Sequence, residues 1–358
     1  MNFYQEHAYS FVDSLIYKIN NLKQKNIPEY LKRICDKIAK KIILNRDEID
    51  DDKDYKSFRF SLYYLNQLID IFSKTTPDVS STWALPLIRE CYYRIGIEIQ
   101  NRNILIIHST DSKSYAVHPD ILADINQDID TEFVIDIFII PSEAKYDIAS
   151  ISLTGHEVGH VFLNSKKDIF LEFIRVNLST ELNKFYTGDL FQGVDVDAYK
   201  KILSAHIEEY LCDYIGRILL GPAFDFAFLK LFCNSEHETN KISVTHPPVN
   251  NRINYSIDSL SDTVKYSNGN LEKALKELAK NFIAVKSSVN PFIKIAEDIA
   301  KRFISEHLNL TKNLTTAELN NIINLVFFEL DSFRPPFETV SINEPHLINP
   351  IQIIIGAT

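Results

Sequence analysis

The sequence predicts a predominantly helical α+β protein with a small β-sheet in its middle. Apolar residues recur at three- and four-residue spacing over most of the chain, which is the period of an amphipathic helix. Two short runs rich in isoleucine and phenylalanine interrupt this pattern between residues 97 and 140, and such residues favour strands. Hydrophobic residues make up 45% of the chain and charged residues 24%, a balance that allows a packed core and excludes wholesale disorder.

The first 95 residues are predicted to form an N-terminal helical region. Helical spacing of apolar residues extends from Phe3 to about Arg94. The acidic stretch Asp47–Asp54 separates two of these helices and is expected to be a solvated loop. Thr76-Pro77-Asp78 marks a second break, before a helix expected from Trp83 to Tyr93.

The central part of the chain is predicted to carry the sheet and then three helical stretches. Strands are expected within residues 97–107 and 133–140, with His118-Pro119 in a loop between them. Pro141 ends the second run, because proline cannot donate to a strand ladder. Helical spacing then returns over 147–164, around 170–185 and over 197–232, as the printed sequence shows.

The C-terminal part is predicted to be helical and to end in an extended tail. Apolar spacing indicates helices over 271–285, 291–307 and 316–333. The tail contains Pro335, Pro336, Pro345 and Pro350, which do not fit a helix. We therefore predict three regions, at residues 1–95, 96–258 and 259–358.

Charge, hydropathy and cysteine content exclude several classes of protein. Lysine and arginine total 38 against 48 acidic residues, and a net charge of −10 repels phosphate, so no nucleic-acid partner is expected. The longest apolar runs are far below the ~20 residues that cross a bilayer, and no secretory signal is recognisable, so no membrane insertion is expected. The four cysteines form no Cys-x-x-Cys pair, which fits a cytoplasmic location.

The chemistry of the chain is predicted from His156-Glu157-Val158-Gly159-His160, a His-Glu-x-x-His sequence within a predicted helix. Residues four apart lie on one helix face, so His156 and His160 can bind one metal ion, while Glu157 can lie beside the metal and accept a proton from a bound water. Gly155 and Gly159 form a second stripe, which indicates a helix pressed against another backbone. The alternative is a pair of surface histidines flanking an exposed glutamate.

A catalytic zinc site needs a third protein ligand and an open position for water. Glu209 is the candidate, because Asp213 follows one turn later and could orient a metal-bound histidine. Glu208 competes with Glu209, and the apolar pattern does not decide which carboxylate faces the core. An exposed acidic edge is the plain structural alternative. His206, three residues before Glu209, could support the site or bind substrate, or could be a surface histidine.

A third motif is Thr245-His246-Pro247-Pro248, followed by Arg252. The two prolines stiffen the backbone next to His246, so the loop can hold an imidazole where it would stabilise an oxyanion. We expect Arg252 to reach back to the carboxylate of Asp213 or Glu209. A loop histidine without a catalytic role is the alternative.

Together the three motifs resemble the M48-type gluzincin metallopeptidases, and the match covers roughly residues 147–255. The resemblance implies a zincin-like catalytic core next to the sheet. It implies Zn²⁺ bound by His156, His160 and Glu209, with Glu157 as the general base and with His246 and Arg252 lining or bracing the site. The implied activity is a zinc-dependent endopeptidase that hydrolyses an intracellular protein substrate, in a soluble branch without transmembrane segments.

Two alternatives stay open at this level. The ImmA/IrrE-type regulatory proteases share the His-Glu-x-x-His motif and a downstream glutamate helix, although Thr245-His246-Pro247-Pro248 favours the first resemblance. A non-catalytic regulatory or scaffold protein on a gluzincin fold is the second, and the intact Glu157 argues against it. In either case we expect the flanking helices to restrict access to the site or to bind a regulatory partner.

Overall fold

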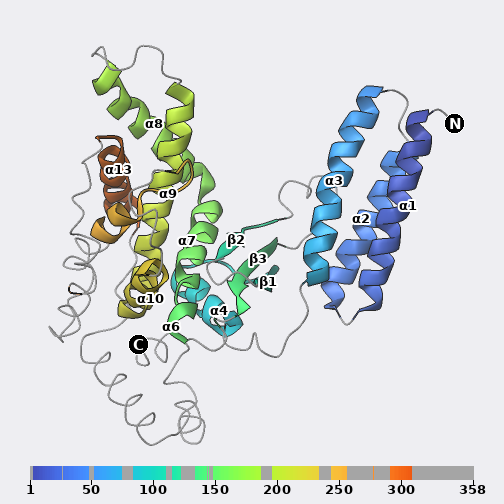
Figure 1. The fold of residues 1–358 in the computed structure, drawn as a ribbon, viewed down its shortest axis with the longest axis horizontal. Coiled ribbons are helices and arrows are strands. Elements are labelled where there is room, and N and C mark those ends of the chain that lie inside the picture. The colour runs from blue at the N-terminus through green and yellow to red at the C-terminus, as the bar shows by residue number, and fades with distance from the viewer. Residues whose placement is uncertain are drawn as a thin grey trace, which may run out of the picture. The chain divides into compact units, whose positions relative to one another are not determined.

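A computed structural model describes residues 3–25, 27–47, 52–74, 84–109, 115–121, 134–142, 144, 148–186, 196–233, 243–255, 277 and 291–308. Over these residues the protein is mainly helical and contains one small three-stranded sheet, so the α+β prediction is confirmed at this level (Figure 1). Among the described helices, none combines the length and the apolar character needed to span a membrane.

The chain forms two compact units, each assembled from separate stretches of sequence. The first comprises Met1–Ser81, Gln100–His108 and Asp120–Phe138, and the second comprises Thr82–Ile99, Ser109–Pro119 and Ile139–Thr358. The division at residues 95 and 258 that the sequence suggests stays a prediction.

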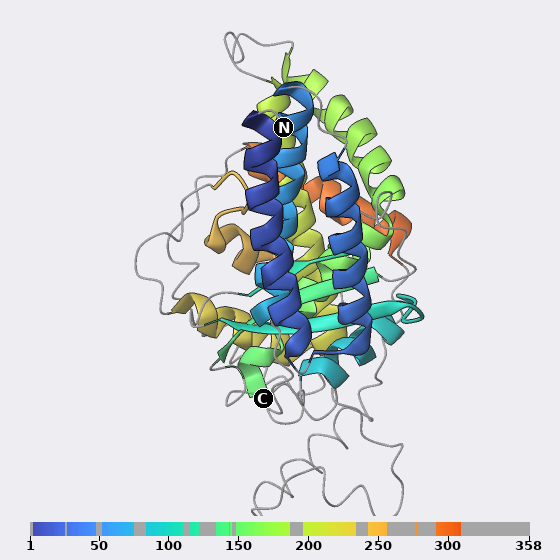
Figure 2. The ribbon, with the colours of Figure 1, turned by 90° about the vertical axis from the view of Figure 1, so that its right-hand side faces the viewer.

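Three long helices dominate the first unit. They are α1 (Phe3–Gln24), α2 (Glu29–Asp47) and α3 (Asp52–Lys74), and they run alongside one another (Figure 2). Each directs an apolar stripe into a shared core, as the helical period predicts. The predicted loop at Asp47–Asp54 overlaps both neighbouring helices, since α2 ends at Asp47 and α3 begins at Asp52, and residues 48–51 lie outside the described residues. Acidic residues suit the first turn of a helix, which the charge pattern alone did not indicate.

The sheet contains β1 (Arg102–Ser109), β2 (Ala116–His118) and β3 (Val134–Pro141), in the order β1-β3-β2. β3 coincides with the predicted run, but two other predictions were wrong. β1 begins at Arg102 rather than at residue 97, because Asn101 has φ 62°, a left-handed conformation typical of turns. His118 ends a strand instead of lying in a loop, because a three-residue strand is too short to show a period.

The second unit contains the remaining described helices and the predicted motifs. Its helices are α4 (Ala84–Arg94), α6 (Ile148–Ile151), α7 (Thr154–Ser165), α8 (Lys167–Tyr186), α9 (Val196–Leu220), α10 (Pro222–Cys233) and α13 (Pro291–His307). Residues 249–255 form a further short helix. The helix predicted over 291–307 is confirmed, whereas those over 271–285 and 316–333 and the tail lie outside the described residues.

The helix predicted over 147–164 is two helices, α6 and α7, with a turn at Ser152 and Leu153 between them. The Ser152 hydroxyl is buried and donates to the carbonyl of Ala223 at 2.8 Å, at the start of α10. The amide of His156 donates to the carbonyl of Leu153 at 3.0 Å, so α7 begins with a tight turn directly before the histidines. Apolar spacing continues through the turn, which explains why the sequence did not reveal it.

α7 and α9 approach each other closely at two glycines of α7, and the two helices lie side by side in Figure 1. A Cβ atom placed on Gly159 would lie 2.7 Å from the Cα of Cys212, and one on Gly155 would lie 3.2 Å from the Cα of Gly216. The predicted close approach at these two glycines is therefore confirmed. β2 also contacts α7, as expected for a sheet beside the His156 helix.

This close packing gives the first prediction. Gly159→Ala should lower the free energy of unfolding by about 1–3 kcal/mol, the usual cost of overpacking, although alanine favours a helix by about 1 kcal/mol over glycine. The new methyl group would meet backbone, which cannot give way locally. Urea unfolding measures the effect. Gly155→Ala is the matched variant and should cost less, because the nearest atom there is the end of the flexible Leu220 side chain. Equal stability of the two variants would contradict the argument.

Candidate metal centre

α7 presents two histidines to α9. His156 and His160 lie one turn apart, with their ring centroids 5.0 Å from each other. Nine of the twelve residues of α7 are buried, His156 and Glu157 among them. Two imidazoles and a carboxylate in such a helix need polar partners, because burying them without any is costly.

The Nδ1 atom of each imidazole lies at hydrogen-bond distance from a carboxylate of α9. His156 Nδ1 lies 2.8 Å from Asp213 Oδ1, and His160 Nδ1 lies 2.8 Å from Glu208 Oε1. A carboxylate only accepts hydrogen bonds, so both rings carry a proton on Nδ1. In a neutral imidazole this leaves the lone pair of Nε2 free to bind a metal ion.

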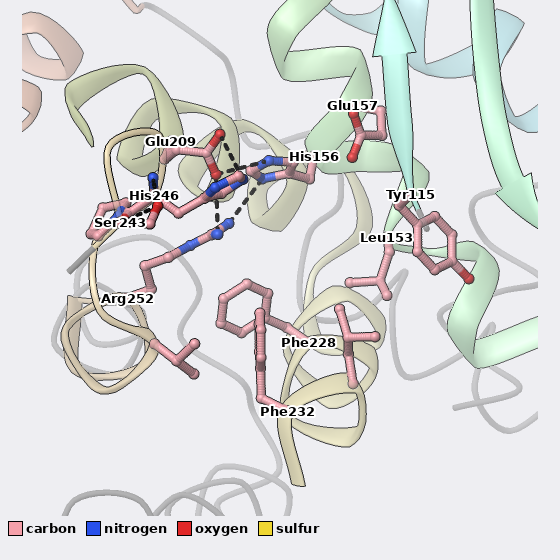
Figure 3. A pocket seen from close by; sticks show the side chains of 13 residues that line it. Tyr115, Leu153, His156, Glu157, Glu209, Phe228, Phe232, Ser243, His246 and Arg252 are labelled. Atoms are coloured by element: carbon pink, nitrogen blue, oxygen red, sulfur yellow. Dashed lines mark hydrogen bonds and ion pairs between the residues drawn. The ribbon is translucent and has the colours of Figure 1, made fainter. Parts of the chain in front are cut away.

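Both Nε2 atoms face the same carboxylate, Glu209. The distances are 3.4 Å from His156 Nε2 to Oε2 and 3.5 Å from His160 Nε2 to Oε1. Figure 3 shows the contact between His156 and Glu209. Glu209 is buried, and its Oε2 accepts no hydrogen bond from the described residues, although Arg252 Nη1 forms an ion pair with it at 3.0 Å. Lone pairs of a neutral imidazole and a carboxylate repel each other, so this arrangement favours a positive charge between them, either a proton or a metal ion.

The carboxylates around His156 favour positive charge at this position. Burial would lower the pKa of His156, but without a metal between these groups the carboxylates of Glu209 and Asp213 raise it to about 10. In the described part of the cluster, Glu157, Glu208, Glu209 and Asp213 supply four carboxylates, and Arg252 supplies the permanent positive charge. A site rich in carboxylate and imidazole, with one arginine, fits a divalent cation.

Arg252 contacts two buried carboxylates of α9, those of Asp213 and Glu209. Its Nε donates to Asp213 Oδ2 at 2.8 Å, and its Nη2 donates to Asp213 Oδ1 at 2.6 Å. Nη1 pairs with Glu209, and the guanidinium carbon lies 5.1 Å from the centre of the Phe228 ring. Burial opposes ionisation of Asp213, yet Arg252 and His156 keep the pKa of that carboxyl below its usual value. The sequence offered Asp213 or Glu209 as partner, and the structure brings Arg252 to both.

A cavity of about 400 Å³ opens beside this cluster. On its polar side lie His156, Glu157, Glu209, His246 and Arg252. Its apolar side is formed by Leu153, Phe228, Leu231, Phe232, Pro247 and Val249. Figure 3 shows Glu157 on one side of His156, with Glu209 and His246 on the other. Burial raises the pKa of the Glu157 carboxyl above its usual value, which makes it a better proton acceptor near neutral pH.

His246 lies at the rim of this cavity, with 56% of its side chain exposed. Its Nε2 is 3.6 Å from Glu209 Oε1, the oxygen that His160 Nε2 also faces, but this is beyond normal hydrogen-bond distance. Tyr115 lines the same cavity, but its hydroxyl donates to the carbonyl of Ser150 at 2.9 Å. Of these two side chains, His246 is therefore the one whose donor can reach a bound molecule.

The structure also gives a place to residues that the sequence left open or missed. Glu208, the competing ligand, has a 38% exposed side chain, and its Oε1 accepts a hydrogen bond from His160 Nδ1. His206 is buried and binds the loop of Ser243 instead of lining the cavity. Phe228 and Phe232 were not recognised, because aromatic residues at helical spacing are indistinguishable from ordinary core residues.

Cys212 lies in the α7–α9 contact, and its thiol is close to both histidines. Ligand atoms of His156, His160 and Cys212 all lie within 4.8 Å of one another, so this group could hold a metal ion. Burial raises the pKa of the Cys212 thiol well above its usual value. The cysteine spacing in the sequence did not indicate a metal ligand here, and the proximity to the histidines arises from packing against Gly159.

A scan against protein-family models, a search of curated proteins and a search of solved structures found no match to this chain.

Proposed function

We propose that this protein is a zinc-dependent endopeptidase of the gluzincin type, with a site like that of the M48-type enzymes, acting on an intracellular protein. The observation that carries the proposal is the convergence of two imidazole Nε2 atoms on the buried Glu209 carboxylate, next to a cavity lined by Glu157. On this reading the helical second unit is a zincin-like core.

We assign the metal ligands as His156, His160 and Glu209. Glu209 is favoured over Glu208 because it is 8% exposed and faces both Nε2 atoms, whereas Glu208 contacts an Nδ1 atom. It is favoured over Cys212 because that thiol packs against Gly159 in the contact between α7 and α9, and burial raises its pKa, which disfavours the thiolate that binds metal. Two histidines and one carboxylate leave a position open for water, as catalytic zinc sites require.

The residues around the cavity have complementary roles in peptide hydrolysis. Zinc, when bound, acts as a Lewis acid and makes water more acidic. Glu157 accepts a proton from the attacking water and returns it to the leaving amine, a role that its raised pKa suits. His246 donates from Nε2 to the oxygen that gains negative charge, and Asp213 and Glu208 keep both ligand imidazoles oriented.

Cleavage of an unstructured protein such as casein, followed by mass spectrometry of the products, tests the activity. The zinc-loaded protein should cleave it, a chelator should stop cleavage, and added Zn²⁺ should restore it. A protein that binds zinc but cleaves none of a broad set of unstructured peptides would favour the regulatory scaffold instead.

Metal analysis gives the second prediction. We expect about one zinc per chain, lost in His156→Ala and in His160→Ala, because each removes a direct ligand. His118→Ala is the matched control, since this exposed histidine on β2 should leave the zinc content unchanged. Full retention of zinc after both ligand histidines are replaced would disprove the assignment of the site.

The third prediction concerns His246. His246→Ala should keep its zinc and its unfolding midpoint but lose cleavage activity by about 10²-fold, the scale for removing one oxyanion donor. The half-exposed imidazole contributes little to packing, so stability should not change. Steady-state kinetics and calorimetry on the same samples measure both quantities. A variant as active as the wild type would make the His246 loop purely structural.

A further inference from the structure

A buried histidine ties the loop of His246 to the helix that carries Glu209. His206 lies on α9, three residues before Glu209, and is 2% exposed. Its Nε2 lies 3.0 Å from the backbone carbonyl of Ser243, and because a carbonyl only accepts, Nε2 is the donor. This hydrogen bond joins residues 37 positions apart, and its donor is shielded from water. The mechanism above leaves it unused.

Ser243 passes this anchoring on to His246. The Ser243 hydroxyl oxygen accepts hydrogen bonds from the backbone N–H of His246 at 2.7 Å and from that of Thr245 at 3.1 Å. The Ser243 N–H donates back to the His246 carbonyl at 3.3 Å, which closes a tight turn. The position of the Ser243 backbone therefore sets the backbone position of His246. The next residue is the buried Pro247, whose ring fixes its own φ angle.

Thr245 acts on the imidazole itself. Its Oγ1 lies 2.7 Å from His246 Nδ1. When the hydroxyl donates this bond, the ring proton is on Nε2, which is the nitrogen closest to Glu209. That tautomer is the one that can donate to an oxyanion. Figure 3 shows Ser243 and His246 together on this loop, above Arg252.

We infer that His206 is the positioning residue for His246. By holding the Ser243 carbonyl from the helix that carries Glu209, it keeps a half-exposed imidazole at a fixed distance from the site. The inference rests on the proposed peptidase function for its kinetic consequences, because a donor displaced by even 1 Å loses much of its effect in a transition state. The positioning itself can be measured without any activity.

The test uses two replacements in the full-length zinc-loaded protein. His206→Phe keeps a flat ring but removes the donor, and His206→Gln keeps an N–H at a similar reach. We expect His206→Phe to lower kcat about tenfold, the scale of one hydrogen bond, with KM and zinc content unchanged, and His206→Gln to restore most of the loss. In a His246→Ala background, His206→Phe should have no further effect. His118→Phe on β2 is the matched control.

Hydrogen exchange of the His246 amide, followed by mass spectrometry, is the readout that does not need activity. It should be about tenfold faster in His206→Phe and close to wild type in His206→Gln. Unchanged exchange in His206→Phe, or an equal loss of kcat with and without His246, would overturn the inference.

Should His206→Phe fail to fold, Ser243→Ala removes the acceptor of the His246 amide and must show the same dependence on His246. If the wild type cleaves no peptide, the proposed function fails, and the exchange rates still decide this inference.

Discussion

Glu157→Gln should reduce peptide cleavage by about 10²–10⁴-fold, the contribution of a positioned general base, while zinc binding and fold stay intact. Glutamine has nearly the same shape as glutamate but cannot accept a proton. Glu157 lies in α7 next to His156 and lines the cavity, so it is within reach of a molecule bound there. Its carboxylate lies apart from the Nε2–Glu209 convergence, so the metal should be retained.

Three measurements on the same preparation separate this role from a structural one. Cleavage of an unstructured protein gives the rate, metal analysis gives the zinc content, and calorimetry gives the unfolding midpoint. Glu172→Gln is the matched control, because Glu172 lies exposed on α8 and pairs with Arg175. An active Glu157→Gln enzyme would remove Glu157 from the mechanism, and a loss of zinc together with activity would mean that it acts as a ligand.

Arg252→Ala should lower the free energy of unfolding by about 3–5 kcal/mol, the range seen when one partner of a buried ion pair is removed. The guanidinium donates two hydrogen bonds to Asp213 and pairs with Glu209, and all three side chains are buried. Without Arg252, two carboxylates would face each other with one fewer positive charge. The loss should appear in urea unfolding as a lower midpoint with an unchanged slope.

A second substitution identifies the cause of this loss. Adding Asp213→Asn to Arg252→Ala removes one of the uncompensated charges, so the double variant should be less destabilised than the sum of the single variants. Arg175→Ala is the control for an exposed pair and should leave the midpoint unchanged. An unfolding midpoint of Arg252→Ala equal to that of the wild type would show that the buried pair contributes no net stability.

Local sequence pattern determined most of the helices and the face of α7 that carries the histidines. Helical periodicity is a property of neighbouring residues, so α13 could be predicted at its observed bounds, and α1, α2 and α9 as helical, although the break between α1 and α2 and the break at Gly221 between α9 and α10 did not show in the period. The same local logic identified His156 and His160, since four-residue spacing places two side chains together on any α-helix. It also indicated a close backbone contact at Gly155 and Gly159, because glycine in a buried helix weakens it without such a contact.

The remaining features depend on which distant segments meet, and only the tertiary structure decided them. Apolar spacing could not decide whether Glu208 or Glu209 faces the histidines, because the two residues are neighbours on α9. That choice depends on how α9 is oriented against α7. The turn at Ser152 is fixed by a hydrogen bond to Ala223, and the loop of His246 is fixed by His206, partners that lie 71 and 37 residues away. A hydrogen bond between such residues leaves no periodic trace in the sequence. The sequence alone therefore determined the spacing of the two histidines and most of the helical segments, and packing determined which carboxylate faces the histidines and what holds the neighbouring imidazole in place.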